Sequence, residues 1–206
     1  MTPAPETAPE PSETWRDAFL RAAEADLETR ARLAATGALF DGYHPEMEAV
    51  HLENAALLEQ AFAAIGWPGR AALGEDGAGA AFLVLQHAIS RPAIQRRGLE
   101  LLLEAVPRGD ASALDAAYLA DRIAVFEGRP QLFGTQFDWF DGALSPSPVE
   151  APDGLDARRA SVGLPPIAEA TASIRAAAVA DGEQPPADLA ARRAGFEAWA
   201  SRVGWR

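Results

Sequence analysis

Apolar residues recur at three- and four-residue spacing along most of this chain, and prolines and glycines separate the stretches. That spacing places them on one face of a helix. Alanine is abundant, whereas valine, isoleucine and threonine are sparse, so residue propensities also favour helix over strand. A chain of 206 residues with 49% hydrophobic content is long enough for one sizeable core. We therefore expect a mainly α fold, a single helical domain with a small β-hairpin appendage.

Start and stop signals define the expected helices. Pro45 and Pro92 suit the first turn of a helix, where the missing N–H of proline costs nothing. Ser112 and Asp115 have the spacing of a capping box, and Gly66 suits a helix end. The predicted helices cover residues 13–35, 45–65, 78–88, 92–107, 112–126, 155–162, 167–180 and 187–203.

The remaining segments complete the expected organisation. Residues 131–137 and 143–149 flank Asp141-Gly142, a dipeptide that supplies positive φ in a tight hairpin turn. The proline-rich residues 1–13 hold too little apolar surface to offset the entropy of ordering, so a disordered tail is expected there. Residues 14–169 then form the helical domain, with its hairpin near 131–149. Residues 170–206 form a C-terminal helical extension.

Charge and residue usage argue against several functions. The formal net charge of −12 repels a phosphate backbone, so no nucleic-acid partner is expected. The chain has no cysteine, which excludes disulfides, thiolate nucleophiles and cysteine-ligated metals. Neither a secretory signal nor a membrane-spanning stretch is evident. The expectation is a soluble cytoplasmic protein that contacts no membrane, and the sequence does not indicate its oligomeric state.

Hydrophilic residues interrupt the apolar stripes of three expected helices. His51 lies four residues after Met47, and Asn54 lies four residues after Val50, so both are expected to point inward. Buried polar groups are costly unless they satisfy one another or bind a ligand, so we interpret such residues as one polar pocket. The set comprises His51, Asn54, Gln86, His87, Asp121 and Arg122, together with Gln131 and Gln136 in the segment that follows.

These residue types suit acid–base chemistry. Histidine changes charge near neutral pH, so His87 is the expected general acid or base, and Asp121 is expected to orient an imidazole. Arg122 is expected to hold an anionic group. The predicted reaction is hydrolysis or group transfer on a small or peptide-like anionic substrate. The expected catalytic residues are His87, Asp121 and His51, and the expected substrate-binding residues are Arg122, Gln86, Gln131, Gln136 and Asn54.

Other readings of the same residues stay open. The protein can be a non-catalytic module that binds a small anionic ligand or a peptide, or the polar residues can form a purely structural network. Two histidines and a carboxylate also suit a divalent metal held by a facial triad. No spacing repeats a known metal-binding motif, so neither a metal nor another cofactor is predicted.

Several short motifs occur together between residues 43 and 169. They are His51-x-x-Asn54, Gly66-Trp67-Pro68, Gln86-His87-Ala88, Ala120-Asp121-Arg122, Gln131-x-x-Gly134-Thr135-Gln136, and Arg158-Arg159 followed by Gly163-Leu164. In this order they resemble a family of uncharacterised bacterial proteins, known as a domain of unknown function. The resemblance implies that the Gln-His, Asp-Arg and Gly-Thr-Gln segments belong to one site or one structural core. The family pattern often continues Gln-His-Ala with an acid, whereas this chain has Ile89.

Overall fold

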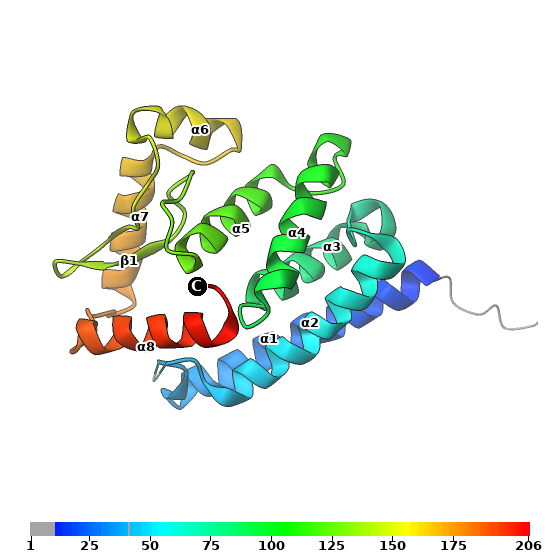
Figure 1. Ribbon diagram of the computed structural model, residues 1–206, viewed down its shortest axis with the longest axis horizontal. Coiled ribbons are helices and arrows are strands. Elements are labelled where there is room, and N and C mark those ends of the chain that lie inside the picture. Colours follow the sequence, from blue (N-terminus) through cyan, green and yellow to red (C-terminus); the bar gives the residue numbers. More distant parts are fainter. Residues whose placement is uncertain (1–10, 41) are drawn as a thin grey trace, which may run out of the picture.

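A computed structural model describes residues 11–40 and 42–206 of the chain (Figure 1). Residues 1–10 of the predicted tail lie outside the described residues, and residues 11–13 belong to helix α1, which begins at Pro11. Within the described residues the structure has eight α-helices and one two-stranded antiparallel sheet. The expectation of a mainly α fold with a small hairpin is therefore confirmed.

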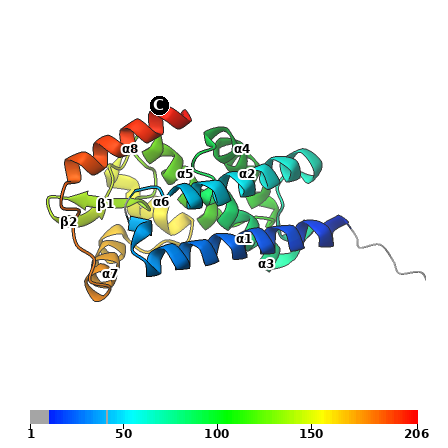
Figure 2. The ribbon, with the colours of Figure 1, turned by 90° about the horizontal axis from the view of Figure 1, so that it is seen from below.

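Five helices build the main core. Helices α1 (Pro11–Ala35) and α2 (Pro45–Ile65) run side by side in opposite directions (Figures 1 and 2). Helix α3 (Arg70–His87) packs on both of them, and α4 (Pro92–Ala105) packs on α2, α3 and α5 (Ala113–Phe126). Short 3-10 helices follow α1 and α4, at Ala38–Phe40 and Val106–Arg108. The core consists of small and branched apolar side chains, with Phe19, Leu58, Leu85, Leu102 and Leu119 fully buried.

The helix starts follow the sequence signals closely. Pro45 and Pro92 each occupy the first turn of their helices. The Ser112 hydroxyl accepts a hydrogen bond from the backbone N–H of Asp115 at 3.3 Å and caps α5. His44 caps α2 in the same way, through its ring Nδ1 and the backbone N–H of Glu46.

Helix α3 begins eight residues before the position expected from the sequence. Gly74 interrupts it with a φ of 74°, a left-handed conformation that glycine adopts without strain. The chain therefore forms a first turn from Arg70, breaks at Gly74 and continues as a regular helix to His87. This first turn was not predicted, because the glycines between residues 69 and 79 lower the helix propensity of that stretch.

The hairpin is shorter than the sequence predicted. Strands β1 (Phe137–Phe140) and β2 (Ala143–Pro146) pair in antiparallel register, and Asp141 and Gly142 both have positive φ in the turn. Residues 131–136 do not continue the first strand, apart from one bridge between Gln131 and Val149. Their backbone N–H groups turn instead towards the carboxylate of a residue in α5.

Three helices complete the chain. A 3-10 turn at Pro152–Gly154 leads into α6 (Leu155–Ser161), which is followed by α7 (Ile167–Ala180) and α8 (Leu189–Val203). The hairpin lies between α7 and α8 at one end of the molecule (Figure 2). Buried Arg159 of α6 donates hydrogen bonds to the carbonyl groups of Phe133, Gly134 and Pro165, which ties α6 to the 131–136 segment.

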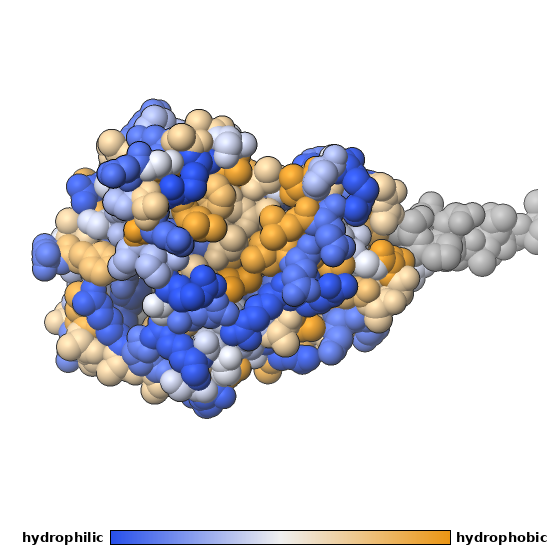
Figure 3. Space-filling model, turned by 45° about the horizontal axis from the view of Figure 1, so that its top comes forward, coloured by the Kyte–Doolittle hydropathy of each residue, from blue (hydrophilic) through white to orange (hydrophobic). Residues whose placement is uncertain are grey.

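The surface has a hydrophobic hollow. Figure 3 shows hydrophobic residues gathered between the end of the molecule that carries α6 and the end that carries α4. The rims of this hollow are largely hydrophilic. None of the described helices is long and apolar enough to cross a lipid bilayer.

Large aromatic side chains attach the end of the chain to the core. Trp205 is 3% exposed, and its indole N–H donates a 2.7 Å hydrogen bond to the carbonyl of Ile89. Its ring lies 5.0 Å from that of Phe126 in α5, and the Arg96 guanidinium lies 5.1 Å from its centre. Trp205 therefore joins the segment after α8 to both α4 and α5.

We expect Trp205→Ala to lower the free energy of unfolding by about 3–5 kcal/mol, because it removes a buried aromatic ring and leaves a cavity. The matched control is Val179→Ala in α7, where the side chain is 81% exposed and the expected change is below about 0.5 kcal/mol. Urea unfolding followed by far-ultraviolet circular dichroism measures both. Equal unfolding midpoints for the two variants would contradict the described packing.

Candidate functional site

A buried carboxylate is the centre of the candidate site. Asp26 lies on α1 and is 0% exposed. It follows buried Phe19 by seven residues and Ala23 by three, so it lies on the face of α1 that packs into the core. A carboxylate without partners would be very costly there.

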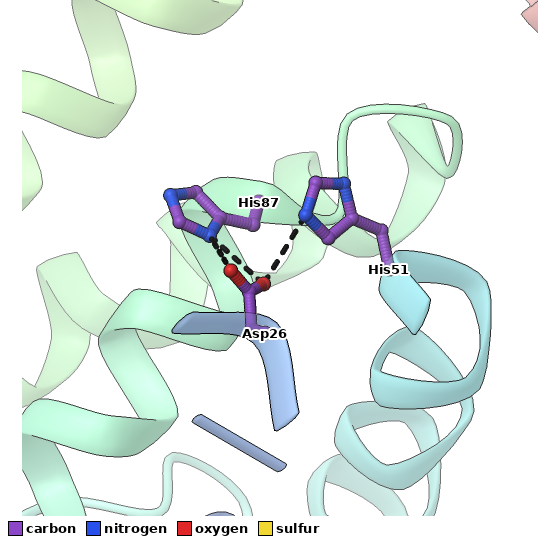
Figure 4. Close-up of side chains that lie close together, drawn as sticks. All are labelled: Asp26, His51 and His87. Carbon is purple, nitrogen blue, oxygen red and sulfur yellow. Dashed lines mark hydrogen bonds and ion pairs between the residues drawn. The ribbon is translucent and has the colours of Figure 1, made fainter. Parts of the chain in front are cut away.

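Two histidines satisfy this carboxylate (Figure 4). His51 of α2 places Nε2 3.1 Å from Asp26 Oδ2, and His87, the last residue of α3, places Nδ1 2.9 Å from the same oxygen. His87 Nδ1 also lies 3.0 Å from Oδ1. The two imidazole rings are 5.3 Å apart between centres. The triad Asp26, His51 and His87 thus joins three different helices at one point.

Burial and hydrogen bonding act on Asp26 in opposite directions. Burial by itself raises the pKa of a carboxyl group, because it penalises the charged form. Hydrogen bonds and charge interactions from His51 and His87 outweigh that effect and hold the pKa of Asp26 well below its usual value. Asp26 is therefore a carboxylate at neutral pH, and it accepts hydrogen bonds from both imidazoles.

Tyr43 extends the triad on its far side. Its hydroxyl lies 2.6 Å from His51 Nδ1, so both nitrogens of His51 have partners. Burial raises the pKa of Tyr43 above its usual range, which keeps the phenol protonated. The neighbouring Ser90 hydroxyl donates to Glu48 at 2.6 Å. His51 is thus held in the middle of a hydrogen-bonded chain.

His87 differs from His51 because only one of its ring nitrogens has a partner among the described residues. Its side chain is 23% exposed, whereas that of His51 is 9% exposed. Figure 4 shows the second ring nitrogen of His87 pointing away from Asp26. Among the described residues, no hydrogen bond reaches that nitrogen. Asp26 therefore orients the His87 ring and leaves Nε2 available.

Arg122 lies close to this site without an acidic partner. It donates a 2.7 Å hydrogen bond to the backbone carbonyl of Gln86, the residue before His87. Burial lowers the pKa of Arg122, and the charge of nearby Arg30 lowers it further. Neither arginine forms an ion pair within residues 11–40 and 42–206. Two cations without an anion are a feature that an anionic ligand would satisfy.

Asp121 contacts backbone rather than an imidazole. Its carboxylate is 0% exposed and accepts hydrogen bonds of 2.7–3.2 Å from the backbone N–H groups of Leu132, Phe133 and Thr135, and from the Thr135 hydroxyl. The sequence predicted that Asp121 orients an imidazole. In the structure, Asp26 makes the contacts with the imidazoles. Asp121 instead holds residues 131–136 against α5, which explains why they do not form a strand.

The remaining predicted site residues are dispersed. Gln131 is buried and bonds to the backbone of Gln136 and Ser147, and the Gln136 amide donates to the Thr135 hydroxyl. Asn54 donates to the backbone carbonyl of Ala22. Gln86 enters only through its carbonyl group, which accepts from Arg122 and from Gln95.

Asp26 and Tyr43 were not singled out from the sequence. The signal for Asp26 was present, because residues 19, 23, 26 and 33 share a helical face and all are buried. Leu27, which lies four residues after Ala23, fits the same spacing but is 50% exposed. No sequence pattern pointed to Tyr43.

We expect Asp26→Asn to destabilise the protein by about 2 kcal/mol at pH 7, because hydrogen bonds to a charged acceptor are lost. Since the folded-state pKa of Asp26 is lowered, its stabilising effect is fully present above the unfolded value of 3.8 and is lost progressively as the pH falls from there towards the lower folded-state pKa. Urea unfolding between pH 2 and pH 7 should show a constant difference from wild type at neutral pH that shrinks below about pH 4. Glu28→Gln, an exposed substitution on the same helix, is the control. A pH-independent difference would refute the assignment.

Comparison with known proteins places the triad within a family. A family model described as a family of unknown function (DUF6624) matches residues 15–182, a span that contains Asp26, His51, His87 and the Asp121 region. Comparisons with curated proteins and with solved structures found no match. The match agrees with the resemblance expected from the short motifs. The chain belongs to DUF6624, a family of unknown function.

Proposed function

We propose that His87 and Asp26 form an acid–base pair that catalyses hydrolysis of a small anionic substrate. The observation that carries this proposal is the asymmetry of His87. A buried carboxylate binds its Nδ1, whereas Nε2 belongs to a partly exposed side chain and points away (Figure 4). A carboxylate in this position fixes the tautomer with hydrogen on Nδ1 and leaves a lone pair on Nε2.

The chemical step follows from that tautomer. His87 Nε2 takes a proton from water while the water oxygen bonds to the acyl or phosphoryl centre. The bond to the leaving oxygen then breaks, and His87 returns the proton to that oxygen. Asp26 stays ionised and stabilises the imidazolium that exists between the two steps. In group transfer an alcohol or amine of the acceptor replaces water.

The presence of Arg122 and Arg30 is the argument for an anionic substrate. Arg122 is anchored to the carbonyl of Gln86, next to His87, and Arg30 lies one helical turn after Asp26 on α1. Two arginines that are close enough to interact and that lack an acidic partner are a local exception in a protein with a net charge of −12. Guanidinium groups bind carboxylate and phosphate in bidentate geometry. Of the sequence-predicted binding residues, Arg122 is the best supported.

The proposal retains the other expectations from the sequence. Without turnover, the same residues would form a binding module for a small anionic ligand or a peptide. In a purely structural network, His87 Nε2 would have neither a hydrogen-bond partner nor a chemical role among the described residues. A cytoplasmic location, without nucleic-acid or membrane partners, is also part of this proposal.

We expect wild-type protein to hydrolyse at least one member of a panel of anionic p-nitrophenyl esters and phosphates, and His87→Gln to lower kcat by about 100-fold or more. Arg122→Gln should mainly raise KM, because it removes a contact that binds the substrate before and during the reaction. Release of p-nitrophenolate, followed by absorbance, measures both effects.

The control uses the third histidine of the chain. His44→Asn keeps a side chain that can cap α2, and His44 is not part of the triad, so turnover should be unchanged. Turnover that persists in His87→Gln would overturn the catalytic role. Saturable binding of phosphate without any turnover would favour the binding module.

The triad also fits a second function, a divalent metal site. One ligand atom from each of Asp26, His51 and His87 lies within 4.8 Å of the others. Ligand atoms at right angles around an ion at about 2.1 Å are about 3 Å apart, and both nitrogens are 2.9–3.1 Å from Asp26 Oδ2. Tyr43 would then orient His51 from the second shell of ligands.

The two functions need different protonation states. A metal needs the lone pairs of His51 Nε2 and His87 Nδ1, whereas the acid–base pair needs hydrogen on His87 Nδ1. Binding of a metal would therefore release protons and replace the hydrogen bonds to Asp26. The same three residues cannot serve both functions at the same moment.

If the triad binds metal, Co²⁺ should titrate the protein with one equivalent and give visible d–d absorption, and Asp26→Ala should abolish that absorption. His44→Asn should bind Co²⁺ like wild type, since a surface histidine is not a ligand in the triad. Titration without a saturable absorption change would exclude the metal site and leave the acid–base pair.

A further inference from the structure

A cavity of about 830 Å³ lies between α5, the hairpin and α8. Its volume falls in the range of roughly 300–1,000 Å³ that is typical of small-molecule sites. Its walls come from segments far apart in the sequence, since Tyr43 and Phe126 face residues 136–138 and one side of α8. It is separate from the triad, and neither Asp26 nor His87 lines it.

Aromatic rings form one wall. Phe126 lies 5.8 Å from Phe196 and 5.6 Å from Trp199 between ring centres, and Trp199 lies 5.9 Å from Tyr43. All four residues line the cavity, and Phe137 of β1 adds another ring. Faces and edges of such rings favour a flat apolar body over a flexible polar chain.

Arginines also line the cavity. Arg192, Arg193 and Arg202 line the cavity from α8. Arg192 pairs with Asp138 at 2.5 Å, and Arg193 donates to the carbonyl of Trp139. Arg202 has neither a hydrogen bond nor an ion pair within the part of the chain that the structure describes. The residues that line the cavity thus include three arginines and one carboxylate, although the whole protein is strongly acidic.

Polar groups on the hairpin side can fix the orientation of a ligand. Gln136 lines the cavity, and its side-chain amide N–H donates a hydrogen bond to the Thr135 hydroxyl. Its amide oxygen accepts no hydrogen bond from the other described residues. Gln136 is the one sequence-predicted binding residue in this wall.

We propose that this cavity binds a small aromatic acid, with its ring against Phe126, Phe196 and Trp199 and its anionic group towards Arg202. This site goes beyond the proposed function, because it does not require turnover at His87. Tyr43 connects the two, since it lines the cavity and bonds to His51.

The test uses 1-naphthoate as the probe and uncharged 1-naphthamide as its neutral counterpart, both by isothermal titration calorimetry on the full chain. We expect naphthoate to bind at one site and more tightly than naphthamide. Arg202→Gln should remove most of that preference, with a loss of about tenfold in naphthoate affinity. Arg97→Gln changes the net charge equally on an exposed part of α4 and should leave the affinity unchanged.

A second variant fills the cavity. A Cβ at Gly195 would meet nothing within 4 Å, so Gly195→Phe can extend into open space without disturbing the fold of α8. It should weaken naphthoate binding by about tenfold or more. Ala198→Phe adds the same ring to an exposed position of α8 that does not line the cavity, and it should bind like wild type.

The outcomes separate this site from the triad. Naphthoate binding that is lost in Gly195→Phe and retained in His87→Gln supports the cavity, whether or not His87 is catalytic. Three results would overturn the proposal: no saturable binding, equal affinity for naphthamide, or binding unaffected by both Arg202→Gln and Gly195→Phe. If Gly195→Phe fails to fold, the Arg202→Gln comparison decides.

Discussion

Burial of the Asp26 carboxylate is the constraint on which the arrangement of the first three helices depends. A charge at 0% exposure needs partners, and it finds them in His51 of α2 and His87 at the end of α3. The three helices must therefore meet in one register, because a shift of one residue would leave the carboxylate unpaired. The same contacts that satisfy Asp26 also create the asymmetry between the two imidazoles.

A second buried carboxylate organises the other half of the molecule. The Asp121 carboxylate accepts hydrogen bonds from the backbone N–H groups of Leu132, Phe133 and Thr135. Arg159 donates to the carbonyl groups of Phe133 and Gly134 in the same segment. Donors and acceptors of an irregular segment are thus satisfied without a sheet. This segment leads into the hairpin, so Asp121 positions one wall of the cavity although it does not touch the triad.

Sequence reasoning reached the helices and the two histidines, but not the residue that joins them. Pro45, Pro92 and Ser112 act locally, so their signals could be read without tertiary structure. Which acid meets an imidazole depends on packing between distant helices, and Asp26 lies 25 residues before His51 and 61 before His87. The sequence pattern favoured Asp121 as the acid that meets an imidazole. In the structure, backbone N–H groups close to Asp121 in the sequence bind its carboxylate instead.

The position of α8 has a consequence for the cavity. The family match ends at residue 182, whereas α8 begins at Leu189 and carries all three arginines of the cavity. The triad therefore lies inside the matched span, whereas the arginines that line the cavity lie outside it. Because Trp205 joins the segment after α8 to α4 and α5, the arginines of α8 are held in a fixed position relative to the core that carries the triad.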